Sequence, residues 1–111
     1  MNRPPGTYNT ASCACRRFDT QEAWYDSYQP GDFFVEEKRG WIWLVLPHGD
    51  HVALPIRGRA TDNPLSSNAA WELSGSPDAP TLSPSIDNYP IADANREGWH
   101  GWLRDGRLVS C

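Results

Sequence analysis

The strongest constraint on the fold of this 111-residue chain is the Asp105-Gly106 pair near its end. Runs of strand-forming residues flank the pair on both sides, at positions 102–104 and 107–109. A two-residue type I′ turn needs positive φ at both central positions, and Asp-Gly is one of the few pairs that tolerate this. We therefore predict a terminal β-hairpin whose register pairs Trp102 with Val109, Leu103 with Leu108 and His100 with Cys111.

His100 and Cys111 share one face of this predicted hairpin, because side chains alternate across a strand. An imidazole and a thiol directly opposite each other are close enough to share a metal ion or a proton. The alternative interpretation is a half-buried pair that closes the hairpin and has no chemical role.

Earlier parts of the chain predict further short strands, separated by turns rich in Gly, Pro and Asp. The apolar run from Trp41 to Leu46 is too short for a typical helix and predicts a central strand buried on both faces. Thr20 is expected to cap one short helix over residues 20–28. Pro84 confines its strand to a sheet edge or a bulge, because proline lacks a backbone N–H. The expected strands before the hairpin are residues 32–37, 41–46, 51–56, 71–73 and 81–86.

This pattern predicts a mostly β fold, a small antiparallel β-sandwich or open barrel built from hairpins, with at most one short helix. We expect residues 1–18 to be loosely ordered and residues 19–111 to form a single domain. Eight apolar side chains make up the expected core: Phe33, Trp41, Trp43, Val45, Leu54, Trp71, Ile86 and Leu103.

Charge and composition narrow the class of protein. The formal net charge is −4, with 10 Lys and Arg against 14 Asp and Glu, so we expect no direct binding to nucleic acid. No apolar run is long enough to span a membrane and no secretory signal is recognised, which predicts a cytoplasmic protein without a membrane partner. Three cysteines are typical of a reducing compartment rather than of a disulfide framework.

Several segments are familiar in their order along the chain. They are Trp71, PTLSPSI at 80–86 and HGWLRDG at 100–106, with weaker support from PGDFF at 30–34 and LPHGDHVALP at 46–55. Together they resemble an uncharacterised protein family of tailed phages and prophages, whose members are often labelled ammonia monooxygenases automatically. That family has no settled activity. The resemblance therefore implies a context, a small phage or mobile-element accessory protein in the host cytoplasm, rather than a chemistry.

One possible metal site combines residues from both ends of the chain: Cys13, Cys15, His100 and Cys111. A Cys₃His set is a legitimate structural zinc site. The spacing is poor, because zinc knuckles use Cys-x₂₋₄-Cys and this chain has Cys-x-Cys. We therefore expect no cofactor and keep zinc as the alternative.

A small peptidase-like hydrolase is the alternative function. Ser83 and Ser85 fall on one face of the strand predicted over 81–86, and His100 becomes their neighbour if that strand pairs with the hairpin. The competing interpretation is that these serines satisfy backbone groups beside a proline.

Two further features belong to this alternative. Asp87 or Asp105 would orient the His100 imidazole and complete a Ser-His-Asp arrangement. Cys111 is a second candidate nucleophile for His100, although a nucleophile on the last residue would be poorly preorganised.

The main expectation is a non-enzymatic inhibitor that binds a host or defence protein complex, such as one that itself binds nucleic acid. Six tryptophans and four tyrosines exceed what a small core buries comfortably, and such residues anchor interfaces. Six acidic residues and no Lys or Arg lie between Phe18 and Glu37, which would steer a basic partner. The expected contact residues are Asp19, Glu22, Trp24, Tyr25, Asp26, Tyr28, Asp32 and Trp102.

Overall fold

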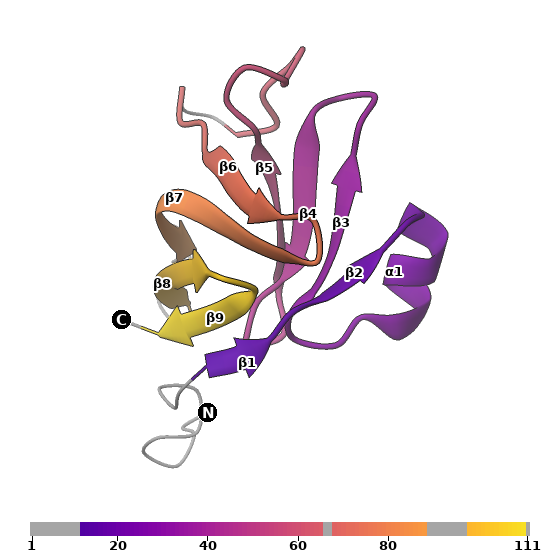
Figure 1. The fold of residues 1–111 in the computed structure, drawn as a ribbon, viewed down its shortest axis with the longest axis vertical. Helices are drawn as coiled ribbons and strands as arrows, with labels where there is room; N and C mark the ends of the chain where they lie inside the picture. The colour runs from indigo at the N-terminus through magenta and orange to yellow at the C-terminus, as the bar shows by residue number, and fades with distance from the viewer. Residues whose placement is uncertain (1–11, 66–67, 89–97, 111) are drawn as a thin grey trace.

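Two β-sheets pack against each other and enclose the core, and one short helix lies beside the second sheet (Figure 1). This computed structural model describes residues 12–65, 68–88 and 98–110. Within those residues the fold is mostly β, with two sheets, one helix and no closed barrel. The predicted fold class is confirmed.

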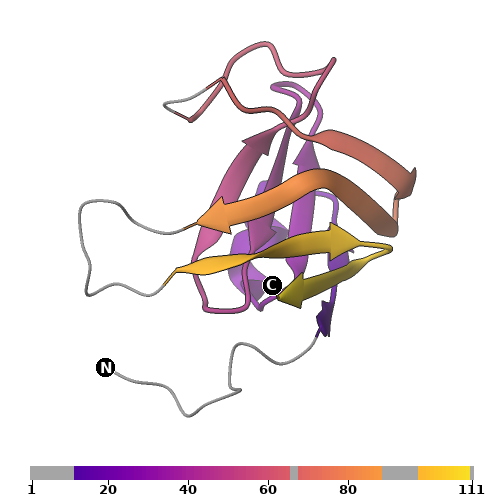
Figure 2. The ribbon, with the colours of Figure 1, turned by 90° about the vertical axis from the view of Figure 1, so that its left-hand side faces the viewer.

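The first sheet has five strands in the order β1-β9-β8-β7-β6, and its neighbouring strands are all antiparallel. Figure 2 shows β7, β8 and β9 stacked side by side in this sheet. Its strands are β1 (Ser12–Ala14), β6 (Glu72–Ser76), β7 (Ala79–Asn88), β8 (Trp99–Arg104) and β9 (Arg107–Ser110).

The second sheet has four strands in the order β2-β3-β4-β5. The pair β2–β3 is parallel, and the other two pairs are antiparallel. Its strands are β2 (Arg16–Phe18), β3 (Asp32–Glu36), β4 (Trp41–Val45) and β5 (His51–Pro55). The strands predicted over 32–37, 41–46 and 51–56 are thus confirmed as β3, β4 and β5, and β4 is buried almost throughout.

The chain crosses from the first sheet to the second between β1 and β2. Loose order was the wrong expectation for residues 12–18, because β1 pairs with β9 and β2 pairs with β3. The Cys15 N–H donates to the Gly106 carbonyl at 2.8 Å, and the Arg16 N–H donates to the Gly31 carbonyl at 3.1 Å. Partners far along the chain hold these three-residue strands, so local sequence pattern gives little sign of them.

The predicted helix is confirmed as α1 (Gln21–Ser27). Thr20 caps it, because its Oγ1 accepts a hydrogen bond from the Ala23 N–H at 3.1 Å. Tyr28 ends it in the left-handed conformation, with φ of 46°. Trp24 is fully buried, and its Nε1 donates to the Asp32 carbonyl at 2.9 Å, which ties α1 to β3.

Seven of the eight expected core side chains are buried: Phe33, Trp41, Val45, Leu54, Trp71, Ile86 and Leu103. Trp43 is the exception and is half-buried. Its neighbours Ile42 and Leu44 face the core, so alternation turns Trp43 toward α1, where its ring centre lies 5.8 Å from that of Trp24.

The terminal hairpin has the predicted register, with Trp102 opposite Val109 and Leu103 opposite Leu108. Asp105 and Gly106 both have positive φ, 48° and 75°, as a type I′ turn requires. The predicted partner of His100 in this hairpin, Cys111, lies outside the described residues.

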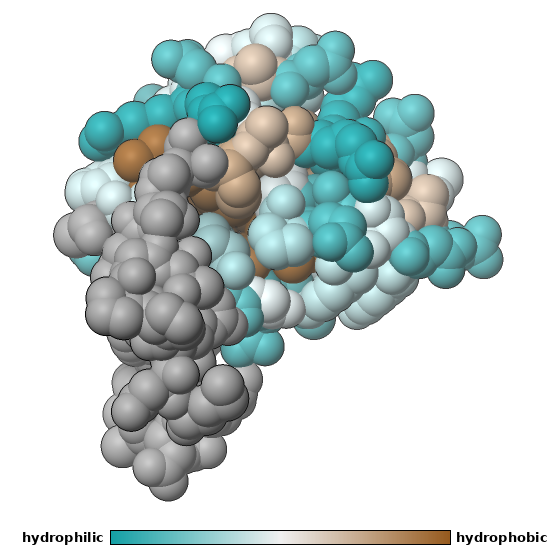
Figure 3. Space-filling model, turned by 90° about the horizontal axis from the view of Figure 1, so that it is seen from below, coloured by the Kyte–Doolittle hydropathy of each residue, from teal (hydrophilic) through white to brown (hydrophobic). Residues whose placement is uncertain are grey.

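Seen from below, the described surface is mainly hydrophilic, with smaller apolar patches in the middle of that face (Figure 3). In the described part of the chain, no helix is both long and apolar enough to cross a membrane.

Gly106 should be costlier to replace than Gly58, although both have positive φ. A Cβ at this position would lie 2.8 Å from the Ala79 Cα, whereas a Cβ at Gly58, with φ of 81°, meets nothing within 4 Å. Gly58→Ala is therefore expected to lose only about 1–2 kcal/mol from left-handed strain. Gly106→Ala should lose about 1–3 kcal/mol more through overpacking. Urea denaturation measures both, and equal losses would contradict the close approach of the turn to β7.

Candidate functional site

Ser85 and His100 meet on the outer face of the five-stranded sheet. Ser85 lies on β7 and His100 on the neighbouring β8, and both are half-buried. The Ser85 Oγ lies 3.1 Å from the His100 Nε2, which is hydrogen-bonding distance. Of the two serines predicted to neighbour His100, Ser83 and Ser85, it is Ser85 that contacts it.

The register explains why this pair faces outward. Ile86 is opposite Gly101, and Ile86 is buried in the core. Residues on either side of an inward-facing pair face outward, so Ser85, His100 and Asp87 share the outer face. Asp87 is the residue directly opposite His100.

A β-bulge at Pro84 sets the position of Ser85. The register shifts between Leu82, which is opposite Leu103, and Ile86, which is opposite Gly101, so β7 holds two residues more than β8 there. Of the two positions predicted for Pro84, a sheet edge or a bulge, the structure has the bulge, because β7 lies between β6 and β8. A bulge leaves extra residues out of the regular ladder, which lets an interior strand accept proline and re-aims the neighbouring side chain.

Trp71 holds the Ser85 backbone from the core side. Its Nε1 donates to the Ser85 carbonyl at 3.2 Å, and Trp71 itself is only 7% exposed. The Trp71 N–H donates to the Pro55 carbonyl at 2.9 Å, and its carbonyl accepts from the Arg57 N–H at 2.7 Å. The end of β5 therefore fixes the tryptophan that fixes Ser85.

Of the two carboxylates considered for His100, only Asp87 has a suitable position. Asp105 is engaged elsewhere, because its N–H donates to the Thr81 Oγ1 at 2.9 Å and its Oδ1 lies 3.5 Å from the same hydroxyl. Asp87 is exposed and stands across the strand pair from the imidazole. Ser83, the other serine considered, is exposed and lies opposite Glu72 on the β6 side.

The residues proposed for zinc are on different sides of the sheet. Cys13 is opposite Leu108 and packs against the core, whereas His100 faces outward. Burial raises the pKa of the Cys13 thiol, and burial is also the main cause that raises the pKa of Cys15 to about 12, which disfavours the thiolate. The described residues contain no group of three or more metal-binding side chains, and Cys111 lies outside them.

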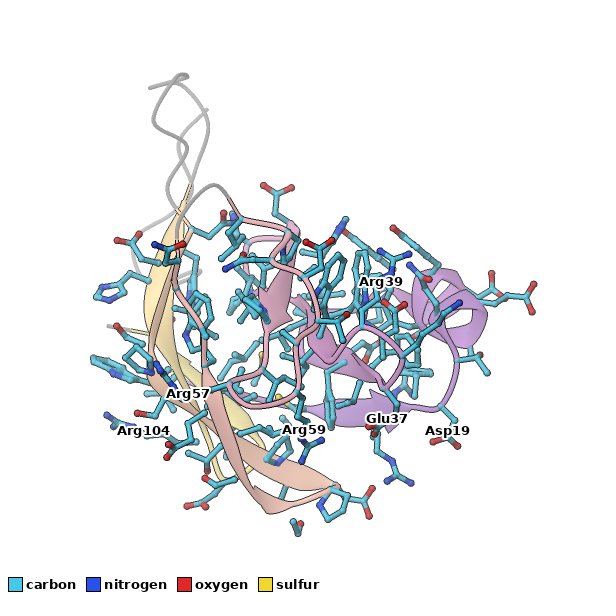
Figure 4. The ribbon with its side chains drawn as sticks, turned by 90° about the horizontal axis from the view of Figure 1, so that it is seen from above. Asp19, Glu37, Arg39, Arg57, Arg59 and Arg104 are labelled. Atoms are coloured by element: carbon cyan, nitrogen blue, oxygen red, sulfur yellow. The ribbon has the colours of Figure 1, made fainter. Side chains whose placement is uncertain are left out.

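A cleft of about 330 Å³ opens between β2–β3 and the β6–β7 hairpin. Apolar side chains such as Phe33 and Leu73 contribute to its walls, and Asp19, Glu37 and Arg59 are among its charged residues (Figure 4). Its lining includes neither Ser85 nor His100. The Ser85–His100 pair therefore does not line this cleft.

The expected partner-binding residues do not form one surface. Trp24 is fully buried and Asp32 is 3% exposed, so neither contributes an accessible contact. Tyr25 is 48% exposed on α1. Trp102 lies on the other sheet, with its ring centre 5.8 Å from that of His100. The remaining expected contacts, Asp19, Glu22 and Asp26, are exposed, and Tyr28 donates to or accepts from the His51 Nδ1 at 2.7 Å.

In the comparison with protein families, residues 19–111 match the model described as bacterial ubiquitination-like system serine protease (BubE). Comparisons with curated proteins and with solved structures returned no match. The matched description names a bacterial system and a protease, so the expected role as a non-enzymatic inhibitor is wrong. The abundance of aromatic residues and the acidic run led to that expectation, and much of both belongs to buried or hydrogen-bonded structure.

Loss of the Trp71 indole N–H should disturb the Ser85 segment specifically. Trp71→Phe leaves the Ser85 carbonyl without this donor and should cost about 1–3 kcal/mol in unfolding free energy. Trp41→Phe is the matched control, because its Nε1 donates to the Asp62 carbonyl at 2.9 Å. Amide NMR shifts should centre on residue 85 in the first variant and on residue 62 in the second. The same shift pattern in both variants would contradict this role of Trp71.

Proposed function

This chain belongs to the BubE family, and we propose that it is a serine peptidase in which Ser85 is the nucleophile and His100 the general base. The observation that carries the proposal is the distance of 3.1 Å between the Ser85 Oγ and the His100 Nε2. A serine hydroxyl is a weak nucleophile at neutral pH, and an imidazole in hydrogen-bond contact is the group that activates it.

The proposed reaction passes through a covalent ester on Ser85, and His100 carries the protons in each step. As the Ser85 Oγ bonds to the carbonyl carbon of the substrate, its proton passes to the His100 Nε2. The C–N bond then breaks, and the amine leaves with that proton. Water attacks the resulting ester and gives a proton to His100, which returns it to Ser85 as the ester bond breaks. The Nε2 accepts the first proton only when the proton of the neutral ring is on Nδ1.

The rigid strands support this role. Ser85 and His100 lie on two paired strands rather than on loops, and the Trp71 indole holds the Ser85 backbone. Sites on regular elements keep their geometry better than sites on loops, which favours a preorganised nucleophile and base.

We assign Asp87 as the carboxylate that orients His100. The register places it directly opposite the imidazole, on the same outer face. Its carboxylate would fix the orientation of the imidazole during the reaction, and salt would screen this effect because Asp87 is exposed.

Polypeptide substrates of a bacterial ubiquitination-like system are the class that the family description suggests, and we propose such a protein as the substrate. A phage or mobile-element setting, which the sequence resemblance implies, would be one place where this system is met. Zinc, with His100 as a ligand, is kept as the alternative cofactor and is addressed by the chelator in the following experiment.

A fluorophosphonate probe, which reacts with activated serines, tests the nucleophile. We expect the wild-type protein to be labelled at Ser85, as located by peptide mass spectrometry, and Ser85→Ala to show no labelling. His100→Gln should slow labelling by about 10²–10⁴-fold, because the general base is lost. Ser74→Ala, an exposed serine on β6, is the control and should react as the wild type does. Labelling should also continue in EDTA. Equal labelling of wild type and Ser85→Ala would overturn the proposal.

The same labelling rate tests Asp87. Asp87→Asn should slow the reaction by about two- to fivefold, the range expected when an exposed charge pair is lost. The decrease should be smaller in high salt, because salt screens exposed charges. Asp78→Asn, at the exposed β6–β7 turn, is the control. If Asp105→Asn slows labelling and Asp87→Asn does not, the assignment of the carboxylate is wrong.

A further inference from the structure

Two exposed arginine side chains are linked to the Ser85–His100 pair through Trp102 and Trp71, and the proposed proton transfers use neither. Arg104 is exposed and lies on β8, on the same face as His100 and Trp102. Its guanidinium carbon lies 4.6 Å from the centre of the Trp102 ring, and that ring centre is 5.8 Å from the centre of the His100 ring. The cation–π contact therefore holds the guanidinium on the outer face against Trp102, the residue whose ring neighbours His100.

Arg57 belongs to the segment that follows β5 and contacts the residues just before β6. Its Nη2 donates to the Ala70 carbonyl at 3.3 Å, and its backbone N–H donates to the Trp71 carbonyl at 2.7 Å. Trp71 is the residue whose indole bonds to the Ser85 carbonyl. Arg57 thus lies on the β6 side of Ser85, and Arg104 lies on the β8 side. Figure 4 shows both on the side of the molecule formed by the five-stranded sheet, away from Arg39.

These two guanidinium groups differ from other arginines in their charge partners. In the ranges that the structure describes, neither Arg57 nor Arg104 forms an ion pair with an acidic side chain, although both are exposed. Carboxylate partners lie within 4.0 Å of four other arginines: Arg16, Arg17, Arg39 and Arg59. A guanidinium binds a carboxylate through two parallel hydrogen bonds, and one already held against a ring loses less freedom on binding.

We propose that the site recognises a carboxylate of its peptide substrate, bound by Arg104 and Arg57 beside Ser85. This inference rests on the proposed role of Ser85 as the nucleophile. The carboxylate would belong either to the C-terminus of the substrate or to an acidic side chain near the scissile bond. Both present the same planar group to the guanidinium fork, and matched peptides separate them.

Protection of Ser85 from the fluorophosphonate probe measures the recognition. Three acetylated dipeptides serve as competitors: Ac-Gly-Gly with a free C-terminal acid, its C-terminal amide, and Ac-Glu-Gly amide. Protection by the free acid alone indicates a C-terminal carboxylate, and protection by the Glu peptide indicates an acidic side chain. Equal protection by all three peptides would overturn the proposal.

Substitutions test whether the protection of Ser85 by the acidic peptides depends on Arg104 and Arg57. Arg104→Gln and Arg57→Gln should each weaken protection by the acidic peptide about tenfold or more, as expected for loss of a charge-assisted hydrogen bond. Arg104→Lys should give an intermediate value, because it keeps the charge but loses the fork. Arg39→Gln is the control, since Arg39 stacks on Trp41 at 4.7 Å in the other sheet. A loss in Arg39→Gln as large as in Arg104→Gln would overturn the proposal.

Failure of catalysis is distinguishable from failure of recognition. If the probe does not label Ser85, the proposed function fails, and the NMR signal of the Arg104 Nε–H group still reports binding. A shift of this signal on titration with Ac-Gly-Gly acid or Ac-Glu-Gly amide, but not with Ac-Gly-Gly amide, supports the carboxylate site. No shift with either acidic peptide overturns it.

Discussion

The indole of Trp71 joins the parts of the molecule on which the site depends. Its backbone bonds to the end of β5 through Pro55 and Arg57, and it pairs with Ile56 where the two sheets meet. Its ring lies in the core, and its Nε1 reaches the carbonyl of Ser85. Burial of a large aromatic ring is strongly favourable only if its N–H finds a partner. The bulge of β7 supplies that partner, so the hydrogen bond that satisfies the indole also holds the backbone of Ser85.

Local patterns predicted the parts of the fold that local interactions determine. The Asp105-Gly106 turn needs only its own φ angles, and its register follows. The cap by Thr20 is equally local. Strands β1 and β2 were missed because their three-residue segments contain no apolar alternation and are held by β9 and β3, which come later in the chain. Pro84 left a sheet edge and a bulge equally open for β7, because both accept a proline, and the structure has the bulge.

The sequence predicted the Ser85–His100 contact only on the condition that their two strands pair. No local motif requires residues 15 positions apart to meet. Its realisation depends on the pairing of β7 with β8 and on the length of the bulge. The interpretation of Trp24 and Asp32 was different. Both lie among acidic and aromatic residues in the sequence, and this predicted an exposed binding surface. Both residues are buried because α1 packs against β3 through the face that carries Trp24. At that contact the Trp24 indole N–H donates to the Asp32 carbonyl. Spacing in the sequence does not decide this.

The abundance of tryptophan has a structural explanation that also singles out the site. Five indole N–H groups bond to the chain: those of Trp24, Trp41, Trp43, Trp71 and Trp99. Each one ties its element to a strand or loop, as buried indoles require. Trp102 differs, because its ring lies on the outer face between the His100 ring and the Arg104 guanidinium. A half-buried ring at this place adds little to the core, and its contacts instead join the His100 ring to the Arg104 guanidinium along β8.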